Sequence, residues 1–427
     1  MKNFLKLSKE ESLEEYKLLL QNYEKIKSQN LKLDMSRGKP ESRQLDLSLE
    51  MLDEINSKSE FITQSGVDVR NYGVCDGLPE MKKFISEVTG TDENNFIVGG
   101  NSSLSMMFDA ISFFMIHGAC GCKPWVKQEK TKFLCPAPGY DRHFAICEYF
   151  GIEMITVKMN ENGPDMDFIE KSVQTDSCIK GIWCVPKYSN PQGVTYSDEV
   201  IKRFARLMPK AKDFKIFWDN AYFVHDLTDE KTSIINILQE CKKNGNEELP
   251  LVFYSTSKIT FPGSGVAFLA CCGENLVNLK KMYSVKTVGF NKINQLRHLK
   301  FLKNKSNLYD HMRKHRKILK PKFDMVTDLL KSEFENNPIL RWNVPKGGYF
   351  VSVDTHPNCA KEVVRLCKEA GVKLTCAGAT FPYGTDPFDS NIRIAPTYPS
   401  TEDLKAAMEL FCLCVKLAFL KKELDIK

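Results

Sequence analysis

Short, almost wholly apolar segments that each end near polar residues constrain the fold of this chain more than any other feature. Three of them occupy residues 179–185, 214–218 and 251–254. Strands of a sheet that is buried on both faces have this composition, because neither side of the strand meets water. The segment 197–209, between the first two, predicts a helix. Strands that alternate with helices predict a mostly parallel sheet with helices on both faces, which is an α/β fold.

Polar residues follow each of these predicted strands. Asn190, Asp219 and Lys258 come just after the first, second and third strand. Ligands of open α/β sheets bind beyond the carboxyl ends of the strands, so we expect these side chains to meet there. Lys258 stands among small hydroxylated residues, and desolvation would leave it a neutral amine that can attack an aldehyde. A lysine in a polar turn is also an ordinary solvated residue, so this motif needs its context.

A turn rich in glycine and serine joins the predicted strand 96–98 to a predicted helix. The turn is Gly99-Gly100-Asn101-Ser102-Ser103. Unpaired N–H groups and the helix dipole at such a turn attract an anion, for example a phosphate. The alternative is that Ser102 or Ser103 only caps the helix. No Gly-Lys-Ser/Thr sequence follows, so the turn is not a P-loop.

The pattern changes after about residue 304, where a long basic helix is predicted for residues 309–334. Short strands are expected at 340–344, 348–353, 371–375 and 392–395, and helices at 360–370 and 401–420. We expect a large domain at 51–308 and a smaller α+β domain at 309–427, which packs with the N-terminal segment 1–50.

Composition excludes several classes of protein. The 427 residues are 42% hydrophobic and carry a net charge of +6, with basic and acidic residues interspersed, so a nucleic-acid footprint is not indicated. Neither a signal peptide nor an apolar run of membrane length is found. The 15 cysteines are scattered and lack metal-site spacing, which predicts a reducing, cytoplasmic compartment and no metal.

One cofactor, pyridoxal 5'-phosphate, would use these positions together. It needs a lysine for its aldehyde, a carboxylate beneath its pyridine nitrogen and hydrogen bonds to its phenolic oxygen. Lys258 can supply the first and Asp219 the second, while Asn190 and Tyr222 can supply the third. Lys258, Asp219 and Tyr222 are therefore the candidate catalytic residues. Asp219 could instead be a polar cap at a strand end.

The cofactor's phosphate, its ring face and the substrate need further partners. The hydroxyl groups that could hold the phosphate belong to Ser102, Ser103, Ser255 and Ser257. Tyr140 could stack on the ring, and Arg393 could clamp a substrate α-carboxylate through two parallel hydrogen bonds. Asn190 is expected to contact the substrate as well. The alternatives are that Tyr140 is a core aromatic residue and that Arg393 forms a surface ion pair.

Three motifs, NPQG at 190–193, DNAY at 219–222 and STSK at 255–258, resemble the cofactor site of class I aminotransferases of fold type I. Other motifs resemble those of the bacterial aspartate aminotransferase subgroup Ic, which is related to the MocR-like aminotransferase domain. They are RGKP at 37–40, YGVCDGLP at 72–79, GGNSS at 99–103, PGYDRH at 138–143, VPKYSNP at 185–191 and NQLRH at 294–298. The resemblance spans nearly the whole chain.

The resemblance implies the fold of type I transferases with pyridoxal 5'-phosphate as cofactor. It implies ping-pong amino transfer from L-aspartate to 2-oxoglutarate. It also implies a homodimer with shared sites, in which Tyr72 reaches the partner's cofactor phosphate and Gly38 lies against the substrate.

Two features depart from the family's pattern. Many class I enzymes place a phosphate-pairing arginine shortly after the lysine, where this chain reads Gly263-Ser264-Gly265-Val266. The cation that would read a side-chain carboxylate is also not identified by the sequence. The candidates are Lys286, Lys292, Arg297, Arg37 and Arg142.

Other functions fit part of the pattern. An aminotransferase for alanine or aromatic substrates, or a β-lyase, would keep the same cofactor residues. A regulatory pyridoxal-phosphate-binding domain is disfavoured, because no segment of winged-helix size precedes Arg37. A nicotinamide-dependent dehydrogenase would need a GxGxxG turn after its first strand, and the turn at 99–103 does not supply one.

Overall fold

The computed structural model describes residues 3–230 and 232–426. Among these residues, eight strands form the main sheet in the order β2-β9-β8-β7-β6-β3-β4-β5. Their bounds are β2 Phe96–Val98, β3 Lys132–Ala137, β4 Glu153–Asn160, β5 Gly163–Pro164, β6 Ile179–Cys184, β7 Lys215–Asp219, β8 Pro250–Ser255 and β9 Ala267–Ala270. Strands β3, β4, β6, β7 and β8 pair in parallel, as the sequence predicts.

The antiparallel edge of this sheet is not predicted from the sequence. Strand β9 returns antiparallel to β8, and β2 pairs antiparallel with β9, so the glycine-serine turn after β2 lies near the end of β8 that leads to Lys258. The short hairpin of β4 and β5 adds a second antiparallel contact at the opposite edge. The central sheet is therefore mixed but mostly parallel.

Residues that alternate along β8 pack into two separate cores. Leu251 and Phe253 join the core under α4 (Ser103–His117), α5 (Asp141–Tyr149) and α9 (Gly273–Lys286). Val252 and Tyr254 join the core on the other face. That face is covered by α3 (Pro79–Thr89), α6 (Met166–Thr175), α7 (Asp198–Ala205) and α8 (Ile237–Lys243). Successive side chains of a strand point to opposite faces, so the doubly covered sheet needs apolar residues at every position.

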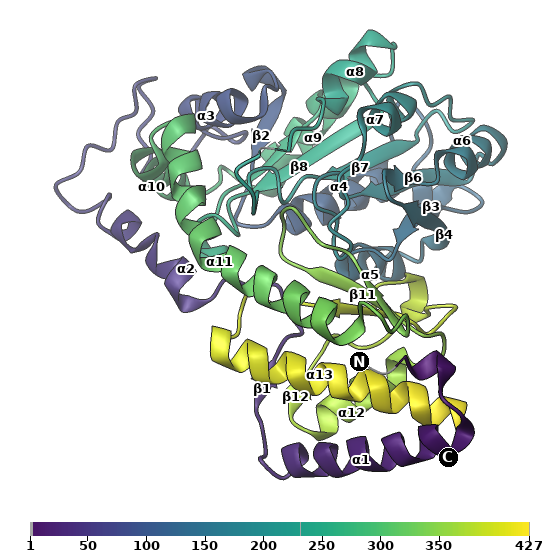
Figure 1. Cartoon of the computed structure of the whole chain (residues 1–427). Coiled ribbons are helices and arrows are strands. Elements are labelled where there is room, and N and C mark those ends of the chain that lie inside the picture. The colour runs from purple at the N-terminus through teal and green to yellow at the C-terminus, as the bar shows by residue number, and fades with distance from the viewer. Residues whose placement is uncertain (1–2, 231, 427) are drawn as a thin grey trace.

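A smaller assembly packs below the sheet in Figure 1 and contains segments from both ends of the chain. An antiparallel sheet joins β10 (Leu340–Trp342), β11 (Val351–Thr355) and β13 (Asn391–Ile394). Strand β1 (Leu33–Asp34) pairs in parallel with β12 (Val372–Lys373). The helices are α1 Lys9–Lys27, α12 Ala360–Glu369 and α13 Thr401–Glu423. Tyr23 and Met35 share one buried core with residues from 319 onward.

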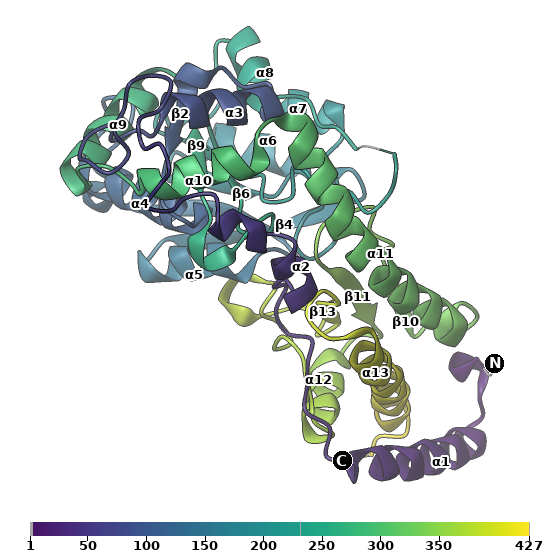
Figure 2. The same ribbon diagram turned by 90° about the vertical axis from the view of Figure 1, so that its left-hand side faces the viewer.

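Helix α11 (Lys305–Phe334) connects the two assemblies and runs along both of them (Figures 1 and 2). It continues through Pro321, which has helical neighbours on both sides. Two further helices, α2 (Ser42–Asp46) and α10 (Lys292–Leu302), lie beside it and contact it. The domain boundaries predicted at 50/51 and 308/309 stay predictions. The continuous helix α11 crosses the second of them.

Within the described residues, no helix combines the length and apolar character needed to cross a membrane. The same residues contain no group of three or more His, Cys, Asp or Glu side chains that could hold a metal ion.

Candidate active site

A cavity of about 540 Å³ lies at the carboxyl ends of β6, β7 and β8 and is closed on its other side by residues of the smaller assembly. The predicted site residues that line it are Gly38, Ser102, Ser103, Tyr140, Asn190, Asp219, Tyr222, Ser255, Ser257, Lys258 and Arg393. Tyr72 is not among the lining residues, and 82% of its surface is exposed. The cavity therefore gathers every predicted site residue except the one expected to act on a partner.

Lys258 lies in the turn that follows β8, residues 256–260, which we call the lysine turn. Its Nζ is 5.0 Å from the ring centre of Tyr222 and 5.8 Å from that of Tyr349. Desolvation lowers the pKa of Lys258, and the nearby Asp219 charge opposes this by raising it. Burial among aromatic rings thus moves the amine toward the neutral form that forms an imine with an aldehyde.

Asp219, the last residue of β7, has one bonded and one unbonded carboxylate oxygen. Its Oδ2 is 3.1 Å from Nε2 of His143. Its Oδ1 is buried and has no hydrogen-bond partner among the described residues. A buried polar atom without a hydrogen-bond partner is costly, so Oδ1 is suited to accept a hydrogen bond from a ligand in the cavity. The residue is therefore more than a polar cap at a strand end.

His143 holds Asp219 from the first turn of α5, and sequence reasoning assigned it no role. Its ring stacks on Trp183 with centroids 4.3 Å apart and planes 6° apart. The rings of Tyr140 and His143 meet edge to face, with centroids 4.9 Å and planes 76° apart. The sequence signals were its place at the end of the PGYDRH motif at 138–143 and its position three residues after Tyr140, which places both at the start of one helix.

The N-terminus of α4 opens into the cavity next to the serines. Ser102 is the N-cap residue, but its side chain makes no capping hydrogen bond. The Ser257 hydroxyl donates to the Asn101 carbonyl at 2.9 Å and ties the lysine turn to the glycine-serine turn. The Ser257 hydroxyl is therefore already used as a donor, while the free helix N–H groups at the start of α4 are donors of the kind that a phosphate needs. These groups fit the phosphate end of pyridoxal phosphate, and Asp219 and Lys258 fit its ring end.

Arg393 on β13 enters the cavity from the smaller assembly. Its Nη1 donates to Asp141 Oδ1 at 2.8 Å and to Asn190 Oδ1 at 3.2 Å, and the guanidinium lies 4.8 Å from the Phe350 ring centre. Only 6% of its surface is exposed, so the alternative of a surface ion pair is wrong. Its Nε is buried and has no partner within the described part of the chain, which leaves a donor for a substrate carboxylate.

Two tyrosines remain protonated donors at the centre of the cavity. Burial, together with the charge of Asp219, raises the pKa of Tyr140 to about 12. Burial and the neighbouring Tyr140 also raise the pKa of Tyr222. Tyr140 and Tyr222 both line the cavity, so neither is only a core aromatic residue.

Glycine is required at position 38 by contact and not by backbone angle. A Cβ atom at Gly38 would overlap the ring of Phe350, which also lines the cavity. The absence of a side chain therefore lets the main chain of residues 36–39 lie directly on that ring.

The five candidate cations divide into two groups. Arg37 and Arg142 line the cavity. The other three are outside its lining and have other partners. Lys286 pairs with Asp109, Lys292 donates to the Gly73 carbonyl and Arg297 donates to Ser264 and Asn294. The cavity also contains Lys39 and Lys373, which the sequence analysis did not name as candidate cations.

Comparison with known proteins decides the family. The family profile described as aspartate amino-transferase matches residues 7–426. The chain belongs to the aspartate aminotransferase family. The resemblance predicted from the sequence is thereby confirmed, and membership of this family makes the chain an aminotransferase, a transferase enzyme.

Individual relatives of this aminotransferase agree with the family. An aspartate aminotransferase of Corynebacterium glutamicum is 43% identical over 401 residues, 93% of this chain and 91% of its own. A Mycolicibacterium smegmatis protein with an aminotransferase name is 46% identical over 97% of this chain and 98% of its own. The crystal structure of an aspartate transaminase from Corynebacterium glutamicum has a TM-score of 0.96 at 41% identity and covers 99% of both chains. The predicted fold class is confirmed.

Proposed function

We propose that this aminotransferase uses pyridoxal 5'-phosphate to transfer the amino group of L-aspartate to 2-oxoglutarate by a ping-pong mechanism. One observation supports this cofactor above all. Oδ1 of Asp219 is buried without a partner in the cavity that also contains Lys258 and the open N-terminus of α4. A protonated pyridine nitrogen, an aldehyde and a phosphate match these three features in turn.

The residues have separate tasks in this mechanism. When bound, pyridoxal phosphate supplies an electron-accepting ring that stabilises negative charge at the substrate's α-carbon. Asp219 keeps the ring nitrogen protonated, and His143 fixes the orientation of its carboxylate. Lys258 would anchor the cofactor, and its amine, once free, would take the proton from the substrate's α-carbon as general base and give it back to the cofactor–substrate adduct as general acid. Tyr222 would be the donor for the cofactor's phenolic oxygen.

Substrate recognition uses cations on the cavity wall. Arg393 binds the α-carboxylate, with its guanidinium oriented by Asp141 and Asn190. Arg37 and Arg142 are the predicted candidates in the cavity that can meet a second carboxylate. A dicarboxylic substrate is further supported by the relatives named as aspartate aminotransferases. An alanine or aromatic substrate would leave these side-chain cations without a partner.

The test is spectroscopic and uses the purified protein. We expect an absorbance band of bound pyridoxal phosphate that disappears when L-aspartate is added and returns with 2-oxoglutarate. L-alanine and an aromatic amino acid are the comparison substrates, and assays for pyruvate and ammonia detect a β-lyase. The Lys258→Ala variant should lose steady-state turnover. A protein without the band, or one that responds equally to alanine, would refute the proposal.

A homodimer with shared sites is part of the same proposal, and an exposed apolar surface around Tyr72 supports it. Gly73 N–H donates to the Val288 carbonyl at 2.9 Å, which places the loop of Tyr72 beside Val288. Val285 and Val288 are 85% and 60% exposed. Apolar surface of this kind is typical of protein–protein contacts. A second copy of the chain would cover it and bring its Tyr72 toward the first copy's phosphate end.

We also place the enzyme in the cytoplasm. All 15 cysteines are free thiols, and many are buried, which favours a reducing compartment. Fusion to a fluorescent reporter would locate the protein directly.

A further inference from the structure

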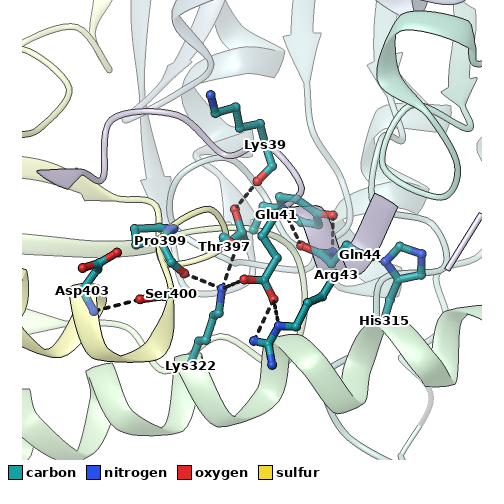
Figure 3. Close-up of polar contacts among 11 residues, drawn as sticks. Lys39, Glu41, Arg43, Gln44, His315, Lys322, Thr397, Pro399, Ser400 and Asp403 are labelled. Atoms are coloured by element: carbon teal, nitrogen blue, oxygen red, sulfur yellow. Dashed lines mark hydrogen bonds and ion pairs between the residues drawn. The ribbon is translucent and has the colours of Figure 1, made fainter. Parts of the chain in front are cut away.

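A fully buried lysine lies behind the wall of the cavity. Lys322 is in the middle of α11 and has no exposed surface. Its ammonium group donates to Glu41 Oε2 at 2.7 Å, to the Thr397 carbonyl at 3.1 Å and to the Pro399 carbonyl at 2.5 Å (Figure 3). An ammonium group has three N–H donors, so these partners saturate it.

The partners of Lys322 continue directly into the cavity. Glu41 follows residues 36–39, which all line the cavity and which we call the rim segment. Thr397 and Pro399 follow β13, which carries Arg393. The Thr397 hydroxyl donates to the Lys39 carbonyl at 3.0 Å, so the two segments are also bonded to each other (Figure 3). One buried ammonium group therefore fastens the rim segment to the strand that carries Arg393.

A second set of contacts leads from Glu41, at the start of α2, to the lysine turn. The Glu41 N–H donates to Gln44 Oε1 at 3.3 Å. Gln44 Nε2 lies 3.1 Å from Nδ1 of His315 and 3.0 Å from the Tyr349 hydroxyl. His315 Nε2 is 3.0 Å from the Ile259 carbonyl, next to Lys258. The start of α2 thus adjoins the rim segment and is linked through His315 to the main chain of the lysine turn.

The energetics favour a geometric role for the pair of Lys322 and Glu41. Removing two charges from water costs several kcal/mol per ion, and apolar residues of similar size are often equally stable in their place. Burial lowers the pKa of Lys322, and the carboxylate of Glu41 raises it again. Neither residue lines the cavity, so neither contacts a ligand there. The pair instead fixes the distance between the rim segment and β13, which both line the cavity.

We propose that Lys322 and Glu41 are positioning residues that hold the rim segment opposite Arg393 and thereby set the enzyme's affinity for carboxylate substrates. This inference rests on the proposed function, because it assumes an amino acid and an oxo acid in this cavity. The proton transfer at Lys258 does not pass through the pair. The expected signature is a raised KM with a nearly constant kcat.

The main variant replaces both charges, Lys322→Met with Glu41→Leu. It leaves no unpaired buried charge, because Arg43, which contacts the other oxygen of Glu41 at 2.8 Å, is mostly exposed. It does remove the lysine donor of the buried Thr397 and Pro399 carbonyls, so we expect the thermal unfolding midpoint to fall by several degrees while the chain still folds. We expect its KM for L-aspartate and for 2-oxoglutarate to rise about tenfold or more, since small misplacements of binding groups are costly. Succinate, a dicarboxylic acid without an amino group, should bind more weakly by a similar factor in calorimetry.

A second variant tests the same connection without changing a charge. Thr397→Val removes only the hydroxyl that bonds to the Lys39 carbonyl, and we expect a smaller rise in KM. The matched control is Lys320→Met on the same helix, because Lys320 is about half exposed and pairs with Asp324 at 2.6 Å. Its KM and succinate affinity should equal those of the wild type.

The outcomes separate the two proposals. A wild type that is inactive with aspartate and 2-oxoglutarate refutes the proposed function. An active wild type and a folded double variant with unchanged KM and succinate affinity refute the positioning role alone. A double variant with a lower kcat at constant KM also refutes it. If the double variant does not fold, an unchanged KM in Thr397→Val overturns the proposal and a raised KM supports it.

Discussion

Single side chains in this cavity owe their chemistry to neighbours that sequence patterns do not reveal. Asp219 is held by His143, which is in turn stacked on Trp183. The stack restricts rotation of the imidazole, so Oδ2 has a fixed partner and Oδ1 stays available to a ligand in the cavity. A carboxylate with one committed oxygen is more precisely placed than one surrounded by water.

Replacement of Asp219 by asparagine should separate binding from chemistry. The amide keeps the size of the side chain but cannot hold a protonated pyridine nitrogen. We expect kcat to fall on the order of 10²–10³-fold, the usual loss when a charge-stabilising group is removed. Exchange of the α-proton of aspartate in D₂O, followed by NMR, measures the step. Exchange at the wild-type rate in a folded variant would contradict the role of Asp219.

The sequence predicted those residues of the cavity that follow the ends of the central strands. Asp219 and Lys258 are positioned by β7 and β8, whose apolar composition is legible without any tertiary information. His143, Phe350 and Lys373 were missed for the opposite reason. Their places depend on how a helix packs against the sheet and how the smaller assembly closes over it, and neither leaves a local pattern.

At the scale of elements, the turn after β8 is held by histidines from three directions. His225 from the β7 side is 3.2 Å from the Lys258 carbonyl. His311 and His315 on α11 approach the Ile259 carbonyl at 2.8 and 3.0 Å. His298 on α10 lies 2.9 Å from the Thr260 hydroxyl. Four of the chain's seven histidines therefore surround one short turn.

This arrangement predicts acid sensitivity. Burial lowers the pKa of His298 to about 4 and that of His315 to about 3. Their unfolded value is about 6.5, so between roughly pH 6.5 and 4 the unfolded state binds more protons than the folded state. The free energy of unfolding is unaffected above this window and should fall, on the order of 3 kcal/mol per histidine, as pH drops through it.

Urea unfolding at pH 7.5 and pH 5 measures this loss. In a His298→Gln variant the difference between the two pH values should be smaller than in the wild type. His117→Gln, which changes an exposed histidine, should leave the difference as it is. Equal pH dependence in all three proteins would show that the buried histidines do not carry the effect.

Elements were predicted well where periodicity was strong and poorly where it was not. The bounds of β2 and β6 agree closely with the patterns at 96–98 and 179–185. Strand β9 was missed because its run of only four apolar residues closely follows the glycines after the lysine turn. Helix α11 begins earlier than predicted, at Lys305, since Asn304 caps it through its side chain.

At the scale of the whole molecule, a Tyr72 variant can be used to test whether two copies of the chain share their active sites. In a dimer of one Tyr72→Ala and one Lys258→Ala subunit, one site has Lys258 from the first subunit and Tyr72 from the second. Co-expression with random pairing should make about a quarter of all sites complete. We expect the mixture to be clearly more active than either variant alone at limiting pyridoxal phosphate. Activity equal to the average of the two variants would contradict shared sites.

Strand β1 pairs with β12 across 339 positions of sequence, with Leu33 opposite Val372. A ribosome releases the chain from its first residue onward, so the lysine turn and its sheet emerge long before β12 and β13 do. Until then β1 has no partner strand and Arg393 has not been made, so the side of the cavity formed by the smaller assembly cannot be completed before nearly the whole chain has been synthesised.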